Sequence, residues 1–161
     1  MKTVYYITAL LLLFAAGTPN LYAQKDKWTG KTESRGGGKY PHGYGIMTYK
    51  NGDVFTGEME FGKKQRGTYT YTNASGIKCK YVGSFFADYW VENNPFIGFG
   101  ELWWDGNYYV GYFSSGKMWG HGTLVLKDGT TKSGIFSDDE FRMGFIADKN
   151  GKLIGIQQSQ K

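Results

Sequence analysis

A short set of glycine-containing motifs recurs along the chain in a fixed order, and it constrains the fold more than any other feature. The motifs are an aromatic residue two positions before a Gly, then Gly-x-Gly, then a turn sequence that ends in Gly. The best copy is Tyr109-Val110-Gly111, Gly120-His121-Gly122 and Asp128-Gly129. The next copy of the first motif ends at Gly134, which is 23 residues after Gly111. A period of this length indicates small supersecondary units that stack on one another.

Copies of each motif can be followed along most of the chain. Gly-x-Gly begins at Gly43, Gly98 and Gly120, with a damaged copy at Gln65-Arg66-Gly67. The aromatic motif begins at Trp28, Phe55, Tyr81 and Tyr109, and Lys132 stands where a later copy would have a ring. The turns end at Gly52, Gly76, Gly106, Gly129 and Gly151. Extra residues near 86–97 separate two of the copies.

Hairpins built on these turns place glycine opposite glycine. Loops of two or three residues that end in Gly are favoured hairpin connections, because Gly accepts the positive φ that they need. The expected pairs are Gly45–Gly57, Gly67–Gly83, Gly100–Gly111 and Gly122–Gly134. Glycine normally weakens a strand unless another group must come close. We therefore expect each pair to leave a slot that is filled by rings of the next hairpin.

The same register sorts the side chains onto two faces, because alternate residues of a strand point in opposite directions. The face that carries the glycines also carries large apolar side chains, which supply the buried area that a single-layer repeat otherwise lacks. The expected core is Met47, Tyr49, Phe55, Met59, Tyr69, Tyr71, Tyr81, Phe85, Leu102, Trp104, Tyr109, Phe113, Leu124, Leu126 and Phe136. Cys79 shares this face and is expected to be a small buried residue with an inert thiol.

These motifs resemble the MORN repeat, whose pattern is approximately Tyr-x-Gly, Gly, Gly-x-Gly, a short strand and an Asp-Gly turn. The resemblance covers about residues 28–155, with four good hairpins and a weak fifth. It implies an all-β fold in which stacked hairpins form a single elongated, twisted antiparallel sheet with a curved groove. We expect this MORN repeat domain to span 24–161 with an insertion near 86–97. Gln65 and Lys132 depart from the pattern, which bears on the curvature and continuity of the groove.

The first 23 residues have the features of a secretory signal peptide. Lys2 gives a positive start, an apolar run follows from Val4 to Ala16, and Ala23 is a small residue suited to cleavage. The run of about 13 residues is shorter than the ~20 that a membrane-spanning helix needs. The alternative is a membrane anchor or a buried helix. We expect an exported protein, secreted or periplasmic, that is cleaved near Ala23.

Composition and charge exclude several classes of protein. Aromatic residues make up 18% of the 161 residues, too many for a disordered segment, and the 25 Gly show no collagen period. One Cys excludes a disulfide scaffold and a Cys-based zinc site. The formal net charge of +5 is a mild excess that favours a solvated surface over a nucleic-acid site.

The residues that catalysis would need are not grouped. His42 and His121 are the only histidines, and they lie about three repeats apart. Asp105 and Asp128 have a sufficient role in turns. Gly-x-Gly would need a strand-to-helix setting to hold a phosphate, which this pattern does not provide. We therefore expect no catalytic residue, no metal, no cofactor and no nucleic-acid partner.

The face opposite the core carries the candidate binding residues. An exposed apolar row with a polar rim commonly marks an interface. The candidates are Phe99, Trp103 and Tyr112 in the row, Arg66 and His121 in the rim with Glu101, and Trp90 in the insertion. In the alternative, the insertion folds over this face and Trp90 covers it.

The resemblance implies a scaffold or binding module, since similar proteins mostly act in this way. The first hypothesis is an exported, non-catalytic module that binds a protein or peptide through Phe99, Trp103 and Tyr112. The second is peripheral binding to anionic phospholipid through Lys63, Lys64 and Arg66, with aromatic rings entering the interface. The third is carbohydrate binding by stacked rings. Self-association through an exposed sheet edge is also plausible.

Overall fold

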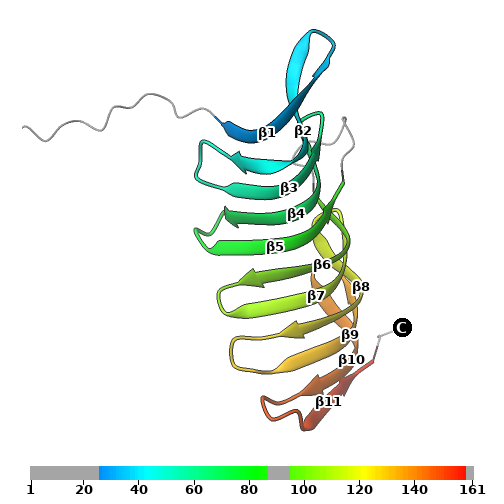
Figure 1. Cartoon of the computed structure of the whole chain (residues 1–161). Coiled ribbons are helices and arrows are strands. Elements are labelled where there is room, and N and C mark those ends of the chain that lie inside the picture. The colour runs from blue at the N-terminus through cyan, green and yellow to red at the C-terminus, as the bar shows by residue number, and fades with distance from the viewer. Residues whose placement is uncertain (1–25, 87–94, 159–161) are drawn as a thin grey trace, which may run out of the picture.

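The computed structural model describes residues 26–86 and 95–158, which form one open antiparallel sheet of 11 strands. The strands are hydrogen-bonded in their order along the chain, so the sheet is an elongated, twisted stack of hairpins (Figure 1). The described residues contain no helix, and hence none that could cross a membrane. The predicted all-β single sheet is confirmed. The expected signal peptide, 1–23, lies outside the described residues.

Five successive hairpins follow the first strand. The strands are β1 (Lys27–Arg35), β2 (Gly38–Thr48), β3 (Val54–Glu60), β4 (Lys63–Thr72), β5 (Lys78–Phe85), β6 (Phe96–Trp104), β7 (Asn107–Ser114), β8 (Lys117–Val125), β9 (Thr131–Ser137), β10 (Glu140–Ala147) and β11 (Leu153–Gln157).

Most turns differ between the two long sides of the sheet, except that the predicted loop Asp105-Gly106 has positive φ at both residues, 45° and 78°, like the turns of the other side. On one side are the predicted loops, such as 50–52, where the Tyr49 amide donates to the Asp53 carbonyl at 2.9 Å. On the other side, Phe61-Gly62 and Ser115-Gly116 have positive φ at both residues, 43° and 83° in the first and 51° and 84° in the second. Two positive φ values in a two-residue loop make the tight turn whose twist matches that of the strands. Gly116 is the single Gly that stands between Tyr-x-Gly and Gly-x-Gly in the MORN pattern, but the sequence analysis did not identify either of these turns.

Glycine lies opposite glycine at every strand junction from β1 to β10. The four predicted pairs are confirmed, and the row also continues between one hairpin and the next, as in Gly57–Gly67 and Gly83–Gly100. We call the whole row the glycine ladder. Its members are Gly30, Gly45, Gly57, Gly67, Gly83, Gly100, Gly111, Gly122, Gly134 and Gly144.

Aromatic rings cover the glycine ladder, but the expectation that they come from the next hairpin was wrong. The ring of Tyr81 covers Gly83 of its own strand and Gly100 of the neighbouring strand. The aromatic-x-Gly spacing puts the ring on the same face as its glycine, so it can lean along its own strand. The Tyr81 hydroxyl then donates to the Ser84 carbonyl at 2.9 Å, which fixes the ring in this position. The rings of Trp28, Phe55 and Tyr109 do the same: each covers the glycine two residues later in its own strand and the partner of that glycine in the next strand.

The strands bend sharply at the glycine ladder. Tyr81 and Phe85 lie on either side of Gly83 in β5, and their ring centroids are 5.2 Å apart because the Tyr81 ring leans over this glycine. The pairing register of β5 with β6 shifts directly after Gly83, and Gly98 in the facing segment has a φ of 68°. A bulge of this kind bends the strand that carries it. The two glycines of Gly-x-Gly thus have separate roles, one in the bulge and one in the glycine ladder.

The bend lets a single sheet enclose a core. We call the face that carries Phe55, Tyr81 and Tyr109 the inner face, and the opposite one the outer face. These three rings are fully buried, and every predicted core residue belongs to the buried cluster or packs against it. The cluster also contains Met118, with Trp28, Phe96 and Phe141 packed on it, which the sequence analysis did not include. Cys79 is buried, as expected.

Candidate functional site

The outer face has a shallow hollow at the middle of the sheet, with a volume of about 490 Å³. Phe99 of β6 and Tyr112 of β7 lie side by side on its wall, with centroids 5.6 Å apart in an edge-to-face arrangement. Their exposed fractions are 58% and 51%. His121 of β8 lies at the same hollow, whose floor includes the backbone of Gly122. Three of the predicted binding residues are therefore brought together.

Trp103 lies in a different hollow on the outer face, near the turn between β6 and β7. Its ring packs against Tyr108 at 5.0 Å, and the Lys80 ammonium lies 4.6 Å from its centroid. The Tyr108 hydroxyl also donates to Glu101 at 2.8 Å. The expected row is thus divided into two separate sites.

Arg66 lies in a third hollow of the outer face, which Tyr44 also lines. The tyrosine is 75% exposed. Lys64, only two residues away, faces the inner side, so the Lys63–Arg66 segment does not present its cations on one surface. Trp90 lies outside the described residues, and the alternative in which it covers the outer face stays a prediction.

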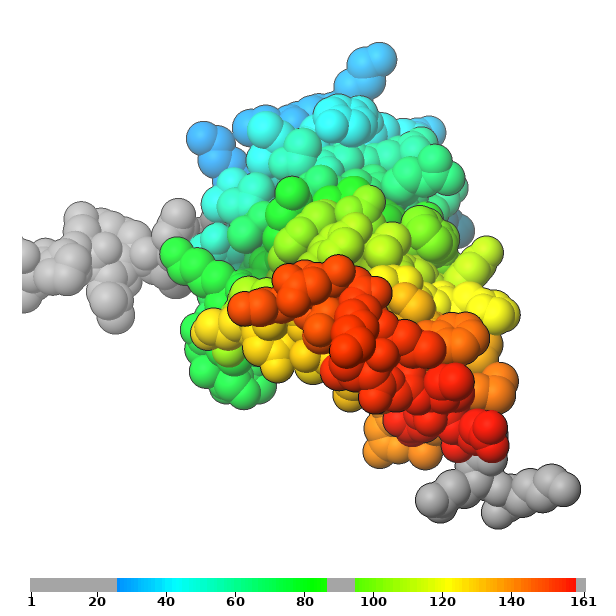
Figure 2. All heavy atoms as spheres, turned by 90° about the horizontal axis from the view of Figure 1, so that it is seen from below, coloured from blue at the N-terminus to red at the C-terminus, as the bar shows by residue number. Residues whose placement is uncertain are grey.

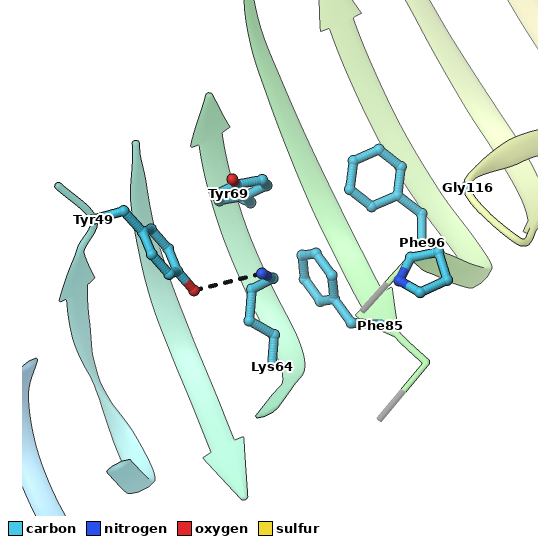
Figure 3. Close-up of a pocket in the computed structure, with 7 residues that line it drawn as sticks. Tyr49, Lys64, Tyr69, Phe85, Phe96 and Gly116 are labelled. Carbon is cyan, nitrogen blue, oxygen red and sulfur yellow. Dashed lines mark hydrogen bonds between the residues drawn. The ribbon is translucent and has the colours of Figure 1, made fainter. Parts of the chain in front are cut away.

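The inner face holds a pocket of about 450 Å³ that the sequence analysis missed (Figure 3). Its walls are apolar, and Lys64 reaches into it. The lining residues are Tyr49, Lys64, Tyr69, Phe85, Pro95, Phe96 and Gly116.

Lys64 lies among the rings of this pocket. Its ammonium is 5.3 Å from the Tyr49 centroid, 4.7 Å from that of Tyr69 and 5.5 Å from that of Phe85. It also donates a hydrogen bond to the Tyr49 hydroxyl at 3.4 Å. Burial lowers the pKa of Lys64 from 10.5 to about 8, and burial raises that of Tyr49 to about 12.

Asp53 supports the pocket from behind. Its carboxylate is buried and accepts hydrogen bonds from the Tyr69 hydroxyl at 2.7 Å and the Thr72 amide at 3.1 Å. The Asn51 side chain donates to it at 2.8 Å. Burial and the bond to Asp53 raise the pKa of the Tyr69 hydroxyl. The network holds the ring of Tyr69 in place beside Lys64.

A bulge explains why the sequence analysis did not place Lys64 on the inner face. Strict alternation from Gly67 would put Lys64 on the outer face with Arg66. In the structure, Glu58 pairs with Arg66 and Met59 pairs with Lys64, which leaves Gln65 as an extra residue. The extra residue turns Lys64 to the inner face. Gln65, at the position of a lost glycine, was the available signal.

The repeat pattern has an independent counterpart among known families. A family model of the MORN repeat matches residues 38–54 and 109–131. Each segment contains a Gly-x-Gly motif, and the second is the best copy described above. The two matched segments are MORN repeats. No curated protein matches it.

The polar groups of this MORN repeat protein are dispersed. His42 pairs with Glu33 at 3.0 Å on β1 and β2, while His121 lies on β8. Within residues 26–86 and 95–158, no group of three or more His, Cys, Asp or Glu side chains could hold a metal ion. Asp138 and Asp139 form a turn, and Asp139 also accepts a hydrogen bond from the Met118 amide at 2.8 Å.

The last hairpin of the MORN repeat protein exposes apolar side chains at the end of the sheet. Figure 2 shows this end of the stack, with β10 and β11 nearest the viewer. β11 is the final strand of the sheet, and Ile154 and Ile156 are 58% and 60% exposed. Phe145 of β10, which pairs with Ile156, is 58% exposed. By contrast, β1 at the other end is rich in charged residues, which discourage edge pairing.

Proposed function

We propose that this MORN repeat protein is an exported, non-catalytic binding module that holds a protein or peptide partner on its outer face. The observation that carries the proposal is the pair Phe99–Tyr112, two large rings that remain half exposed beside a hollow of about 490 Å³. Aromatic residues in such positions are the usual anchors of protein interfaces. Trp103 forms a second contact point rather than part of the same hollow.

The chemistry of the hollow favours an apolar side chain of the partner. Phe99, Val110 and Tyr112 supply apolar surface, and His121 supplies an imidazole at the same hollow. The Thr123 and Ser133 hydroxyls are 3.1 Å apart and satisfy each other. Strands β6 to β9 are already paired on both sides, so the partner is held by side chains and not by strand addition.

A peptide selection tests the proposal. A random peptide library is selected on the purified protein, and the recovered peptides are measured by titration against the double variant Phe99→Ser/Tyr112→Ser. We expect peptides with a shared apolar position whose affinity falls at least about tenfold in the variant. Ile154→Ser removes an equally exposed apolar side chain elsewhere and should leave binding unchanged. Equal binding to wild type and double variant would remove this surface as the partner site.

Lipid and carbohydrate binding remain the alternatives, and each has its own assay. Vesicle flotation with anionic and neutral lipid detects peripheral binding, which should weaken with salt. The separation of Lys64 from Arg66 onto opposite faces removes the basic cluster on which the lipid hypothesis was built. A glycan array would detect a sugar ligand. Mass spectrometry of the exported protein tests cleavage near Ala23.

A further inference from the structure

The last strand of the sheet, β11, has one unpaired edge. It is hydrogen-bonded to β10 on one side, and none of the described strands lies on its other side (Figure 2). The backbone N–H and C=O groups of that side can pair with a strand of another molecule. β11 has the sequence Leu-Ile-Gly-Ile-Gln, which contains neither the charged residues nor the proline that commonly protect such an edge.

Apolar side chains flank this edge on the outer face. Ile154 and Ile156 lie on the same face as Phe145, which pairs with Ile156, and all three are more than half exposed. Isoleucine favours strands because its branched side chain packs against cross-strand neighbours. Ile156 has such a neighbour in β10, and a further strand would give both isoleucines one on the open side.

The sequence of β11 is complementary to itself. When two copies of the strand pair antiparallel about a two-fold axis at Gly155, Ile154 of each copy faces Ile156 of the other. An axis at either isoleucine would pair only that residue with itself. The register at Gly155 also places Lys152 opposite Gln158, so no like charges face each other in a protein whose formal net charge is +5.

The edge at the other end of the sheet is a poor partner for β11. Its register with β2 shifts after Gly30, and an irregular strand hinders edge pairing. β1 also carries four charged residues, namely Lys27, Lys31, Glu33 and Arg35. Pairing of β11 with β1 would leave a free edge on each copy and give an open chain of molecules, whereas pairing of β11 with itself closes after two copies.

We propose that β11 binds β11 of a second copy of this chain, in an antiparallel two-fold arrangement centred on Gly155. The two sheets then continue into one another. A strand of five residues forms a small interface, so the dissociation constant should lie in the micromolar range. This edge is separate from the outer-face site of the proposed function. The double variant Phe99→Ser/Tyr112→Ser should dimerise as the wild type does, so that either proposal can fail alone.

Sedimentation velocity of the purified protein, over about a hundredfold range of concentration, tests the association. The wild type should pass from monomer to dimer and form no larger species. Ile156→Lys should weaken the dimer at least about tenfold, because each ammonium would face Ile154 of the other copy. Ile46→Lys is the matched control. It makes the same change at an exposed isoleucine of β2, a strand paired on both sides, and should dimerise like the wild type.

Cysteine cross-linking tests the register. Directly opposite residues of an antiparallel pair have Cα atoms about 4.5–5.5 Å apart, which a disulfide can span. Gly155→Cys should therefore give a cross-linked dimer on mild oxidation, and a Cβ fits there because its nearest contact is 3.7 Å. Ile154→Cys should not, since the two copies of this residue would be diagonal neighbours about 7–8 Å apart. The wild type is the blank, because Cys79 is buried.

Several results would overturn the dimer. These are a wild type that stays monomeric at every concentration, an unchanged affinity in Ile156→Lys, an equal loss in Ile46→Lys, or cross-linking of Ile154→Cys and not of Gly155→Cys. Species that keep growing with concentration would indicate pairing of β11 with β1 and would also contradict the closed dimer. Circular dichroism verifies the folding of each variant. If Ile156→Lys does not fold, the wild-type titration and the two cysteine variants decide the question.

Discussion

The phenol of Tyr81 lies against the backbone of Gly100 in the neighbouring strand, so that a Cβ at this glycine would be 2.6 Å from the tyrosine hydroxyl oxygen. Tyr81 is fully buried and hydrogen-bonded through its hydroxyl, so it has no room to move aside. The aromatic motif of one strand and the Gly-x-Gly motif of the next are therefore two halves of a single packing arrangement.

Gly100→Ala should destabilise the protein by about 1–3 kcal/mol, because the added methyl group overpacks a closed site. Gly155→Ala is the matched control, since a Cβ there meets its nearest atom at an ordinary 3.7 Å. Urea unfolding measures both. A Gly100→Ala protein as stable as the Gly155→Ala protein would show that Tyr81 does not close the slot.

Asp53→Asn should cost about 2 kcal/mol, because one carboxylate oxygen becomes a donor that faces other donors. The Tyr69 hydroxyl and the Thr72 amide would both lose charge-assisted bonds. Asp105→Asn is the comparison, as it changes an exposed ion pair with Lys127 and should cost at most about 0.5 kcal/mol. Thermal unfolding of the two variants checks the difference. Equal melting temperatures would contradict the structural role of Asp53.

Lys64 should make the protein more stable as the pH rises from about 8 to 9.5. Its pKa is lowered to about 8 in the folded chain and is 10.5 in the unfolded chain, so the unfolded chain binds more protons in this range. Stability rises with pH wherever that holds. The gain should be absent in Lys64→Met. The pKa of the Cys79 thiol is also shifted by folding, but this thiol is present in both proteins, so subtracting one unfolding free energy from the other removes its contribution. If the unfolding free energies of the two proteins changed equally with pH, the burial of the Lys64 charge would be refuted.

Cys79 should react at least about a hundredfold more slowly with a thiol reagent such as Ellman's in the native protein than in urea. The side chain is buried and burial raises its pKa, which disfavours the reactive thiolate. Absorbance after mixing gives both rates. A native rate close to the unfolded rate would mean that the inner face opens readily around β5.

The register of the hairpins could be predicted because each turn is specified locally. Gly52, for example, marks a turn by its sequence context, and counting outward from it gives the pair Gly45–Gly57. The core face follows from the same count. Met118 and Phe96 were missed because they come before Gly-x-Gly, at the far ends of strands whose register was counted from the turns.

The candidate sites were harder to predict because they depend on how far apart neighbouring strands place their side chains. Phe99 and Tyr112 were grouped correctly since they are direct partners. Trp103 shares their face, but it pairs with Tyr108 at the turn end and lies in a separate hollow. The Lys64 pocket depends on the bulge at Gln65, and a bulge reverses the alternation on which the sequence count relies.

Each ring of the aromatic-x-Gly motifs covers a junction between two strands, one on either side of a hairpin boundary. Tyr81 joins the hairpin of β4 and β5 to that of β6 and β7, and Tyr109 joins the latter to that of β8 and β9. An isolated hairpin would keep its turn but would lose the glycine of the next hairpin that its ring contacts. The cooperative unit of this molecule is therefore the junction between hairpins, and loss of a single strand, unlike loss of a whole hairpin, would leave one ring without the glycine that it covers.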